Sequence, residues 1–337
     1  MKIAIHNSSA SWSFCQYWKR YCEEHDIDYK LVNAYDTDII RQLDDCEAFM
    51  WHHNHTVHKD RLFAKSLLFS LETAGKKVFP NFYTGWHFDD KVGQKYLFES
   101  VGAPIVNSYV FYDFQEAKKW IRQTEFPKVF KIRSGSGSAN VFLVKNQKNA
   151  LKLAKKNIKR GISTYNKMGD IRETLRRYKL KQTSIFNVLK SFIRLFVSTQ
   201  FSKQHGRETG YAYFQDFIPD NAYDIRVVVI GNKAFSIRRI VRENDFRASG
   251  SGMIQYAKNM LDERCVKISF DVTRKIRSQC AAYDYVFDKQ NNPLIVEVSY
   301  GFDQKGYNDC VGYWDEQMNW YEGSFNPQGW IFELIIK

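Results

Sequence analysis

The sequence predicts an α/β protein with a Rossmann-like first domain, followed by mixed α+β units. Short apolar strands alternate with amphipathic helices over the first ninety residues, which is typical of a parallel sheet. Hairpins interleaved with helices follow as far as about residue 300. The length of 337 residues is about twice that of a typical domain, so at least two packed units are expected.

The periodicity of apolar residues places the elements of the first domain, residues 1–88. Strands are predicted at 2–6, 28–34, 46–52 and 76–81, and helices at 13–26 and 61–75. Further along, helices are predicted at 89–102, 116–123 and 271–283. Strands or hairpins are predicted at 128–146, 211–219, 224–240 and 284–300.

Composition excludes several classes of protein. Hydrophobic residues make up 44% and charged residues 26%, which excludes disorder for most of the chain. No apolar run reaches the roughly 18 residues needed to cross a bilayer, and the N-terminus looks like a first strand and not a signal peptide. The six cysteines form no CxxC pair, so reduced thiols in a cytoplasmic protein are expected.

The positive charge is concentrated in one segment. Residues 151–210 contain 15 Lys/Arg and 3 Asp/Glu, a net +12, whereas the remaining 277 residues contain 35 basic and 34 acidic residues, a net +1. A nucleic-acid binder would spread its charge more widely, so nucleic acid is disfavoured as a partner. We interpret residues 150–209 as a basic, partly helical insertion.

The insertion contains a predicted amphipathic helix with one apolar side. Two interpretations remain open: a lid packed on the enzyme, or docking on an anionic surface such as the inner face of a membrane or a polyanion. The oligomeric state is not predicted. The apolar side consists of Ile185, Val188, Leu189, Phe192, Ile193 and Phe196.

A glycine-serine turn, GSGSAN, follows a strand that ends near Lys131. Backbone N–H groups of such a turn, including those of Ser136 and Gly137, can cradle phosphates, and a lysine on the preceding strand can reach the same phosphates. The turn lacks the third glycine of a dinucleotide fingerprint, and the sequence has no Walker-A motif. Alone, this pattern is a weak signal for nucleotide binding.

A predicted hairpin places two carboxylates, Asp284 and Glu297, on facing strands. Mg²⁺ is often bound by one or two carboxylates together with substrate phosphates. Glu297 also lies within the apolar run PLIVEVSY, where an unpaired carboxylate would be costly to bury. We therefore predict a metal site on this hairpin.

Taken in order, the motifs resemble those of the ATP-grasp superfamily, and within it the glutathione-synthetase-like and ribosomal-protein glutamate ligase branch. The resemblance covers about residues 85–300. The motifs are DK at 90–91, PKVFK at 127–131, GSGSANV at 135–141, QDFIP at 215–219, DIRVVVIGNK at 224–233, RR and DFR within 238–247, and D…PLIVEVS at 284–299.

The resemblance implies an ATP-grasp fold: an N-terminal Rossmann-like domain over 1–88, then two α+β subdomains that sandwich ATP. The subdomains are expected at 89–214, with the insertion at about 150–209, and at 215–337, with the metal site and an aromatic tail. ATP and Mg²⁺ are the implied cofactors, with Mn²⁺ as a substitute for Mg²⁺.

The resemblance also implies roles for individual residues. Phosphates of ATP would be contacted by Lys91 and Lys131, adenine by Gln215, Asp216 and Phe217, and the ribose by Asp224. Arg247 would neutralise the γ-phosphate and an acyl-phosphate, while Arg226 and Arg239 would hold an anionic substrate. The metal ligands would be Asp284, Glu297 and Ser299, although the family usually has asparagine at the position of Ser299.

The implied activity is an ADP-forming ligation of a carboxylate to an amine, or to a thiol, through an acyl-phosphate. We expect as one substrate a sugar acid or other acid of a bacterial cell-surface glycan. The alternatives are an ATP-binding regulatory protein without ligase activity and a kinase-like phosphotransferase. The histidines His52, His53, His55 and His58 are interpreted as a substrate-facing loop or as solvated side chains, ahead of a zinc site.

Overall fold

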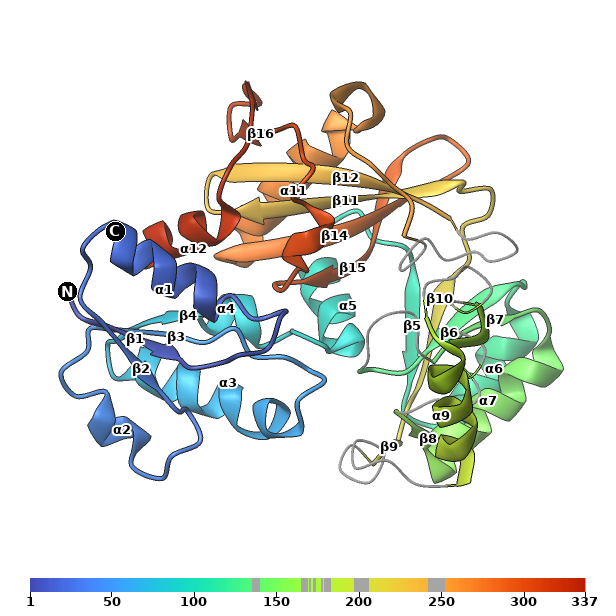
Figure 1. The fold of residues 1–337 in the computed structure, drawn as a ribbon. Coiled ribbons are helices and arrows are strands. Elements are labelled where there is room, and N and C mark those ends of the chain that lie inside the picture. The colour runs from blue at the N-terminus through green and yellow to red at the C-terminus, as the bar shows by residue number, and fades with distance from the viewer. Residues whose placement is uncertain are drawn as a thin grey trace. The chain divides into compact units, whose positions relative to one another are not determined.

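The computed structural model describes residues 1–134, 140–164, 169, 171, 174–176, 178, 183–196, 206–241 and 252–336. The chain forms two compact units (Figure 1). Unit 1 comprises Met1–Phe88, Gly93–Ile105 and Ile218–Lys337, and unit 2 comprises Asp89–Val92 and Val106–Phe217.

Unit 1 begins with a parallel sheet of strand order β2-β1-β3-β4. Its strands are β1 (Ile3–His6), β2 (Tyr29–Val32), β3 (Ala48–Met50) and β4 (Lys77–Phe79), and the helices between and after them are α1 (Cys15–Glu24), α2 (Ile39–Gln42), α3 (His58–Thr73) and α4 (Phe82–Gly85). All residues of β1 and β3 are buried, as expected of central strands covered on both faces. The predicted Rossmann-like sheet is confirmed.

The second sheet of unit 1 is antiparallel, with the order β15-β14-β11-β12-β16-β17 and β13 beside β12. Its strands are β11 (Tyr223–Ile230), β12 (Lys233–Ile240), β13 (Ile254–Gln255), β14 (Cys280–Phe287), β15 (Pro293–Ser299), β16 (Gly312–Asp315) and β17 (Trp320–Glu322). The associated helices are α5 (Lys91–Ser100), whose first two residues belong to unit 2, α11 (Glu263–Ile276), α12 (Pro327–Ile336), η1 (Lys258–Met260) and η2 (Gln304–Gly306).

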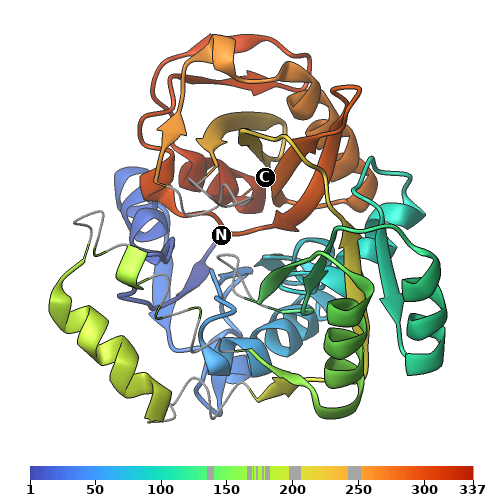
Figure 2. The same cartoon turned by 90° about the vertical axis from the view of Figure 1, so that its right-hand side faces the viewer.

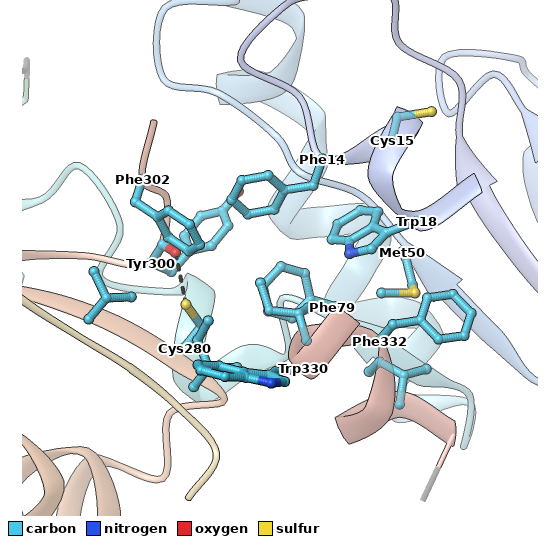
Figure 3. Close-up of a cluster of buried hydrophobic side chains, with 14 of the residues drawn as sticks. Phe14, Cys15, Trp18, Met50, Phe79, Cys280, Tyr300, Phe302, Trp330 and Phe332 are labelled. Atoms are coloured by element: carbon cyan, nitrogen blue, oxygen red, sulfur yellow. Dashed lines mark hydrogen bonds between the residues drawn. The ribbon is translucent and has the colours of Figure 1, made fainter. Parts of the chain in front are cut away.

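The two faces of the antiparallel sheet contribute to different cores, because side chains alternate along each strand. Ile225, Val227 and Val229 of β11 pack in a cluster with residues of α11. Val228 and Ile230 belong to a second cluster, which also contains residues of β1, α1, β4 and α12. Figure 3 shows this second core, in which Phe14, Trp18, Phe79, Cys280, Tyr300 and Trp330 lie together.

The helix predicted over 271–283 is wrong in position. The observed helix α11 ends at Ile276, where the C-cap Arg277 takes a left-handed conformation with φ of 56°. The chain then enters β14 at Cys280. The apolar residues CAAY, which suggested a continuing helix, are instead the buried start of a central strand.

Unit 2 is built on the sheet β5-β10-β6-β7, with α6 and α7 on one face (Figure 1). Its elements are β5 (Ser108–Phe111), α6 (Phe114–Gln123), β6 (Lys128–Lys131), β7 (Val141–Val144), α7 (Gln147–Arg160), β8 (Ile162–Ser163), α9 (Ile185–Phe196), β9 (Arg207–Glu208) and β10 (Ala212–Asp216). Ala117, Phe130, Ala150, Ala154 and Phe214 form the core between sheet and helices.

The basic insertion begins later than the sequence suggested. Helix α7, placed within it by its lysines, packs Ala150 and Ala154 in the core of unit 2. The short strands β8 and β9 then pair Ile162 with Glu208. The insertion therefore lies between β8 and β9 in the chain, and α9 is a helix described within it.

Buried thiols and aromatic rings contribute further to the cores. All six cysteines are free and buried, and burial raises the pKa of Cys22 to about 12. In the tail, Trp314 and Trp330 are buried whereas Tyr321 is exposed. None of the helices in the described ranges is long and apolar enough to cross a bilayer.

Candidate functional site

Polar side chains gather at one end of the antiparallel sheet of unit 1. The strand register pairs Asp224 with Arg239, Arg226 with Asp284, and Asp284 with Glu297. Residues directly opposite each other in a sheet share a face. These five side chains therefore lie on the face that carries Val228 and Ile230 further along β11.

Arginines and aspartates of this cluster form a connected network. Arg239 donates from Nε and Nη2 to the two carboxylate oxygens of Asp224, both at 2.7 Å. Its Nη2 also lies 2.9 Å from Asp284 Oδ1, and Arg226 Nε lies 3.3 Å from the same oxygen. Arg239 thereby connects two carboxylates, so its side chain positions Asp224 and Asp284.

Burial determines the electrostatics of the network. Burial lowers the pKa of the Arg239 and Arg226 guanidinium groups, but the attractions of Asp284, Asp224 and Tyr307 together outweigh it and both pKa values are raised. Tyr307 lies against the same charges, and burial raises its pKa to about 12 although Arg226 and Arg239 oppose that shift. Both arginines stay charged and hold Asp284 in place.

Removing Arg239 should cost far more stability than removing an exposed ion pair. Arg239→Ala leaves Asp224 and Asp284 without their shared partner, and breaking a buried pair costs about 3–5 kcal/mol. The matched control is Arg264→Ala, because Arg264 pairs with Asp262 at the surface, where a pair contributes about 1 kcal/mol or less. Urea unfolding measures both variants. Equal losses of the free energy of unfolding in the two variants would show that the buried network adds no more stability than a surface ion pair.

Glu297 and Ser299 lie next to Asp284 on β15. Glu297 is the register partner of Asp284, and Ser299 follows two residues later on the same face. The Ser299 hydroxyl donates to Gly301 O at 3.0 Å and accepts from Gly301 N at 3.2 Å. The structure therefore brings the three predicted metal ligands onto adjacent strands, with Ser299 engaged in a tight local turn.

The donors at this position suit Mg²⁺. In the part of the chain that the structure describes, no group of three or more His, Cys, Asp or Glu could hold a metal ion. Mg²⁺ needs no such cage, because it commonly takes one or two carboxylates and completes its shell with water and substrate phosphates. Asp284 and Glu297 provide two such carboxylates on neighbouring strands.

A second polar cluster lies in unit 2. Lys131 Nζ donates to Gln215 Oε1 at 2.6 Å, and Gln215 Nε2 donates to Ser108 Oγ at 3.2 Å. Tyr213 donates its hydroxyl to the same Ser108 oxygen at 2.9 Å. All four side chains are buried, and they share the sheet face that is not covered by α6 and α7. Ser108 and Tyr213 were not predicted as site residues, because in the sequence they resemble ordinary strand residues.

Asp216 lies apart from this cluster. Side chains alternate along β10, so Asp216 points to the opposite face from Gln215. Its carboxylate pairs with Lys128 Nζ at 2.6 Å and accepts from Tyr109, whose ring packs against the core beneath the helices. The predicted contact of Asp216 with adenine therefore involves a carboxylate that Lys128 already holds. Phe217 follows directly and is partly buried.

Side chains anchor both ends of the glycine-serine turn. Ser134, which precedes the turn, donates to Glu208 Oε1 at 2.7 Å. Asn140, which ends it, donates from Nδ2 to Ser163 O at 3.0 Å and to Thr164 O at 2.9 Å. Glu208 is an isolated acidic residue in a stretch of basic residues. This contrast in charge is the feature of the sequence that could have identified Glu208 as an anchoring residue.

Other predicted residues are placed as follows. Lys91 is buried at the start of α5, where its backbone N–H donates to Arg133 O at 3.0 Å. Ser136, Gly137 and Arg247 lie outside the described residues.

Two of the four histidines after β3, His52 and His53, are buried, and His55 and His58 are partly exposed. His52 Nδ1 accepts from Phe14 N at 3.3 Å, so the remaining proton is on Nε2, and burial lowers the pKa of His52 to about 3. The Nε2 atom lies 3.0 Å from where a Cβ on Gly301 would stand, an approach that glycine permits. His53 O accepts from Tyr300 OH at 2.6 Å. His52 and His53 are therefore not solvated, and their role stays a prediction.

Comparisons with known proteins identify the fold. Residues 153–313 match the RimK-like ATP-grasp domain. A RimK-domain ATP-grasp protein from Sphaerobacter thermophilus DSM 20745 is 13% identical, with a TM-score of 0.56 and 100% of each chain covered. N5-carboxyaminoimidazole ribonucleotide synthetase from Thermotoga maritima is 14% identical, with a TM-score of 0.53 over 89% of this chain and 68% of that one.

A third similar structure carries ligands. The ATP-grasp ligase PsnB, solved with its minimal precursor, Mg and ADP, is 10% identical, with a TM-score of 0.54 over 99% of this chain and 97% of that one. No curated protein sequence matches this chain. The predicted ATP-grasp fold is confirmed by these likenesses.

Proposed function

We propose that this chain, which carries a RimK-like ATP-grasp domain, is an ATP- and Mg²⁺-dependent ligase that joins a carboxylate to an amine and forms ADP and phosphate. The observation that carries the proposal is the pairing of Asp284 with Glu297 across adjacent strands of an ATP-grasp fold, beside the charged Arg226 and Arg239. Such a set of charges suits a phosphoryl transfer, in which stabilising the phosphoryl oxygens is the main task of the protein.

We assign Asp284 and Glu297 to hold Mg²⁺, with Ser299 as a third contact, direct or through water. When bound, Mg²⁺ or Mn²⁺ neutralises charge on the phosphate oxygens. Arg226 and Arg239 fix the position of Asp284, and the positive charge of Arg226 is available to the acid substrate. Arg247 is proposed to neutralise the transferred phosphoryl group.

The proposed nucleotide contacts come chiefly from unit 2. Lys131 and Lys91 would pair with phosphates, and the N–H groups of Ser136 and Gly137 would cradle them. Gln215, Asp216 and Phe217 would contact adenine. Asp224 would lie near the ribose. The hydrogen bond from Lys131 to Gln215 supports the first assignment, because it holds the ammonium group on the sheet face opposite α6 and α7.

The proposed chemistry has two steps. A substrate carboxylate oxygen attacks the γ-phosphorus of ATP, the bond from that phosphorus to the bridging oxygen breaks, and ADP leaves. The amine then attacks the carbonyl carbon of the acyl-phosphate, phosphate leaves, and the nitrogen loses a proton. Positioning and charge stabilisation suffice for both steps, so no nucleophilic side chain is needed.

As the finer assignment, we propose that the acid belongs to the sugar acids or related acids of a bacterial cell-surface glycan, and that the amine is an amino acid or a simple amine. An exposed aromatic surface supports this choice: Tyr321 of β17 is exposed and stacks on Tyr313 at 5.0 Å between centroids. Aromatic faces of this kind provide apolar contact area with a polar end, which suits a sugar ring.

Nucleotide binding is expected to depend on Lys131. ATP with Mg²⁺ at about 100 times its Kd should stabilise the wild type by about 2.7 kcal/mol, which raises the melting temperature by several degrees. Lys131→Met keeps the apolar stem of the side chain but removes the ammonium group, so most of the shift should disappear. Differential scanning fluorimetry measures it, and Lys152→Met, a change at an exposed lysine of α7, is the control. An unchanged shift in Lys131→Met would exclude the phosphate contact.

The ligase reaction itself is tested with a matrix of acids and amines. ADP and phosphate release should require one acid and one amine together. ADP formation with an acid alone would indicate a phosphotransferase, and binding of ATP without turnover for any pair would indicate a regulatory protein.

A further inference from the structure

Helix α9 exposes its apolar side. Four of the residues predicted to line that side, Ile185, Leu189, Phe192 and Ile193, are 44–59% exposed, and Phe186 beside them is 70% exposed. At about 100° per residue, these positions form one stripe roughly 120° wide. Scattered exposed apolar residues need no explanation, but a continuous stripe of large ones indicates a contact surface.

The buried side chains of α9 lie along a different edge of the helix. Val188 and Ser191 are 4% and 1% exposed, and they lie next to the stripe around the helix axis. Helix α9 is therefore seated in the described structure by this narrow edge, and its broad apolar stripe faces outward.

Basic residues precede and follow the exposed apolar stripe in the sequence. Residues 164–206, between β8 and β9, contain nine Lys/Arg and two Asp/Glu, a net +7, and Lys190, on the other flank of the stripe, is exposed. Figure 2 shows α9, yellow-green, standing away from the green helix α7 within unit 2. The charge excess extends over 43 residues, which suits a surface of many mobile anionic groups better than one groove on a protein.

We propose that α9 docks on an anionic lipid bilayer, with Phe186, Leu189 and Ile193 inserted among the lipids and basic residues of the same segment on the headgroups. With 12 residues the helix is about 18 Å long, too short for the roughly 30 Å hydrocarbon core, so it lies in the plane of the interface. The proposal is independent of the ligase reaction, because none of these residues is assigned to the chemistry.

Co-sedimentation with vesicles tests the proposal on the full-length protein. Wild type should sediment with vesicles of equal parts phosphatidylglycerol and phosphatidylcholine at 0.1 M salt, and not with phosphatidylcholine alone. Binding should fall steeply at 1 M salt, because the Debye length falls from about 10 Å to about 3 Å. The triple variant Phe186→Gln/Leu189→Gln/Ile193→Gln should bind at least about tenfold more weakly, since its apolar contact area is lost.

The matched control removes exposed apolar surface elsewhere. Leu62 and Phe63 on α3 are 54% and 53% exposed, so Leu62→Gln/Phe63→Gln changes a similar area without touching α9, and it should bind like wild type. Circular dichroism confirms that each variant is folded. No binding of wild type to anionic vesicles, equal binding to neutral vesicles, or undiminished binding of the α9 variant would each overturn the proposal.

Discussion

Replacing Glu297 by glutamine should lower ligase turnover by at least about 10²-fold, because a bound metal contributes several kcal/mol of charge stabilisation to the transition state. Glutamine has the shape of glutamate but lacks its charge, and Glu297 is only partly buried, so the fold should persist. The effect should be on turnover and on the concentration of Mg²⁺ required.

Phosphate release under saturating ATP measures this loss, with the melting temperature as the test of folding. Glu322→Gln is the matched control, because Glu322 is an exposed carboxylate on β17 of the same sheet. Ser299→Asn, which introduces the usual family ligand, should be tolerated. Near wild-type turnover in Glu297→Gln would place the metal elsewhere.

Acid should destabilise the protein steeply between pH 6.5 and pH 4. Burial lowers the pKa of His6 and His87 to about 4 and that of His52 to about 3, and it holds the pKa of His53 well below its usual value. Below pH 6.5 the unfolded chain takes up these protons and the native state does not. The contribution of these neutral histidines to the free energy of unfolding is therefore fully present above pH 6.5. As the pH falls, each histidine lowers the free energy of unfolding by up to about 1.4 kcal/mol per pH unit.

His87 is the most informative of the four for this test. Both of its ring nitrogens are buried without a hydrogen-bond partner among the described residues, so an apolar replacement breaks no bond there. Urea unfolding from pH 7.5 to pH 4.5 should show a shallower loss of stability in His87→Leu than in wild type. The control His25→Gln changes an exposed histidine at the C-cap of α1. Identical slopes for all three proteins would refute the assignment.

The sequence predicted the fold where periodicity and motif order agree. The parallel sheet followed from apolar strands separated by amphipathic helices, and the hairpin spacing placed Asp284 opposite Glu297, as the register shows. The prediction from sequence failed where two patterns in one segment indicated different structures. The lysines of α7 suggested an insertion, although its alanines pack in a core.

The ion-pair partners of side chains at the candidate sites were harder to predict from the sequence. In the sequence, Arg239 suggests a free anion-binding group, whereas in the structure it joins Asp224 and Asp284. That pairing depends on the register of the β11–β12 hairpin with β14, a strand that begins 40 residues further along the chain. Likewise, the contribution of Tyr307 follows from a loop that returns to the sheet, for which no local pattern exists.

The shared core of unit 1 has a consequence for synthesis on the ribosome. Trp18 and Phe79 are buried together with Tyr300 and Trp330, so the first 88 residues lack part of their core until the last helix has emerged. Unit 2 is almost continuous in the chain and is complete before β11 is made. The nascent chain therefore completes unit 2 first, while its N-terminal sheet exposes apolar side chains that chaperones recognise until α12 has been made.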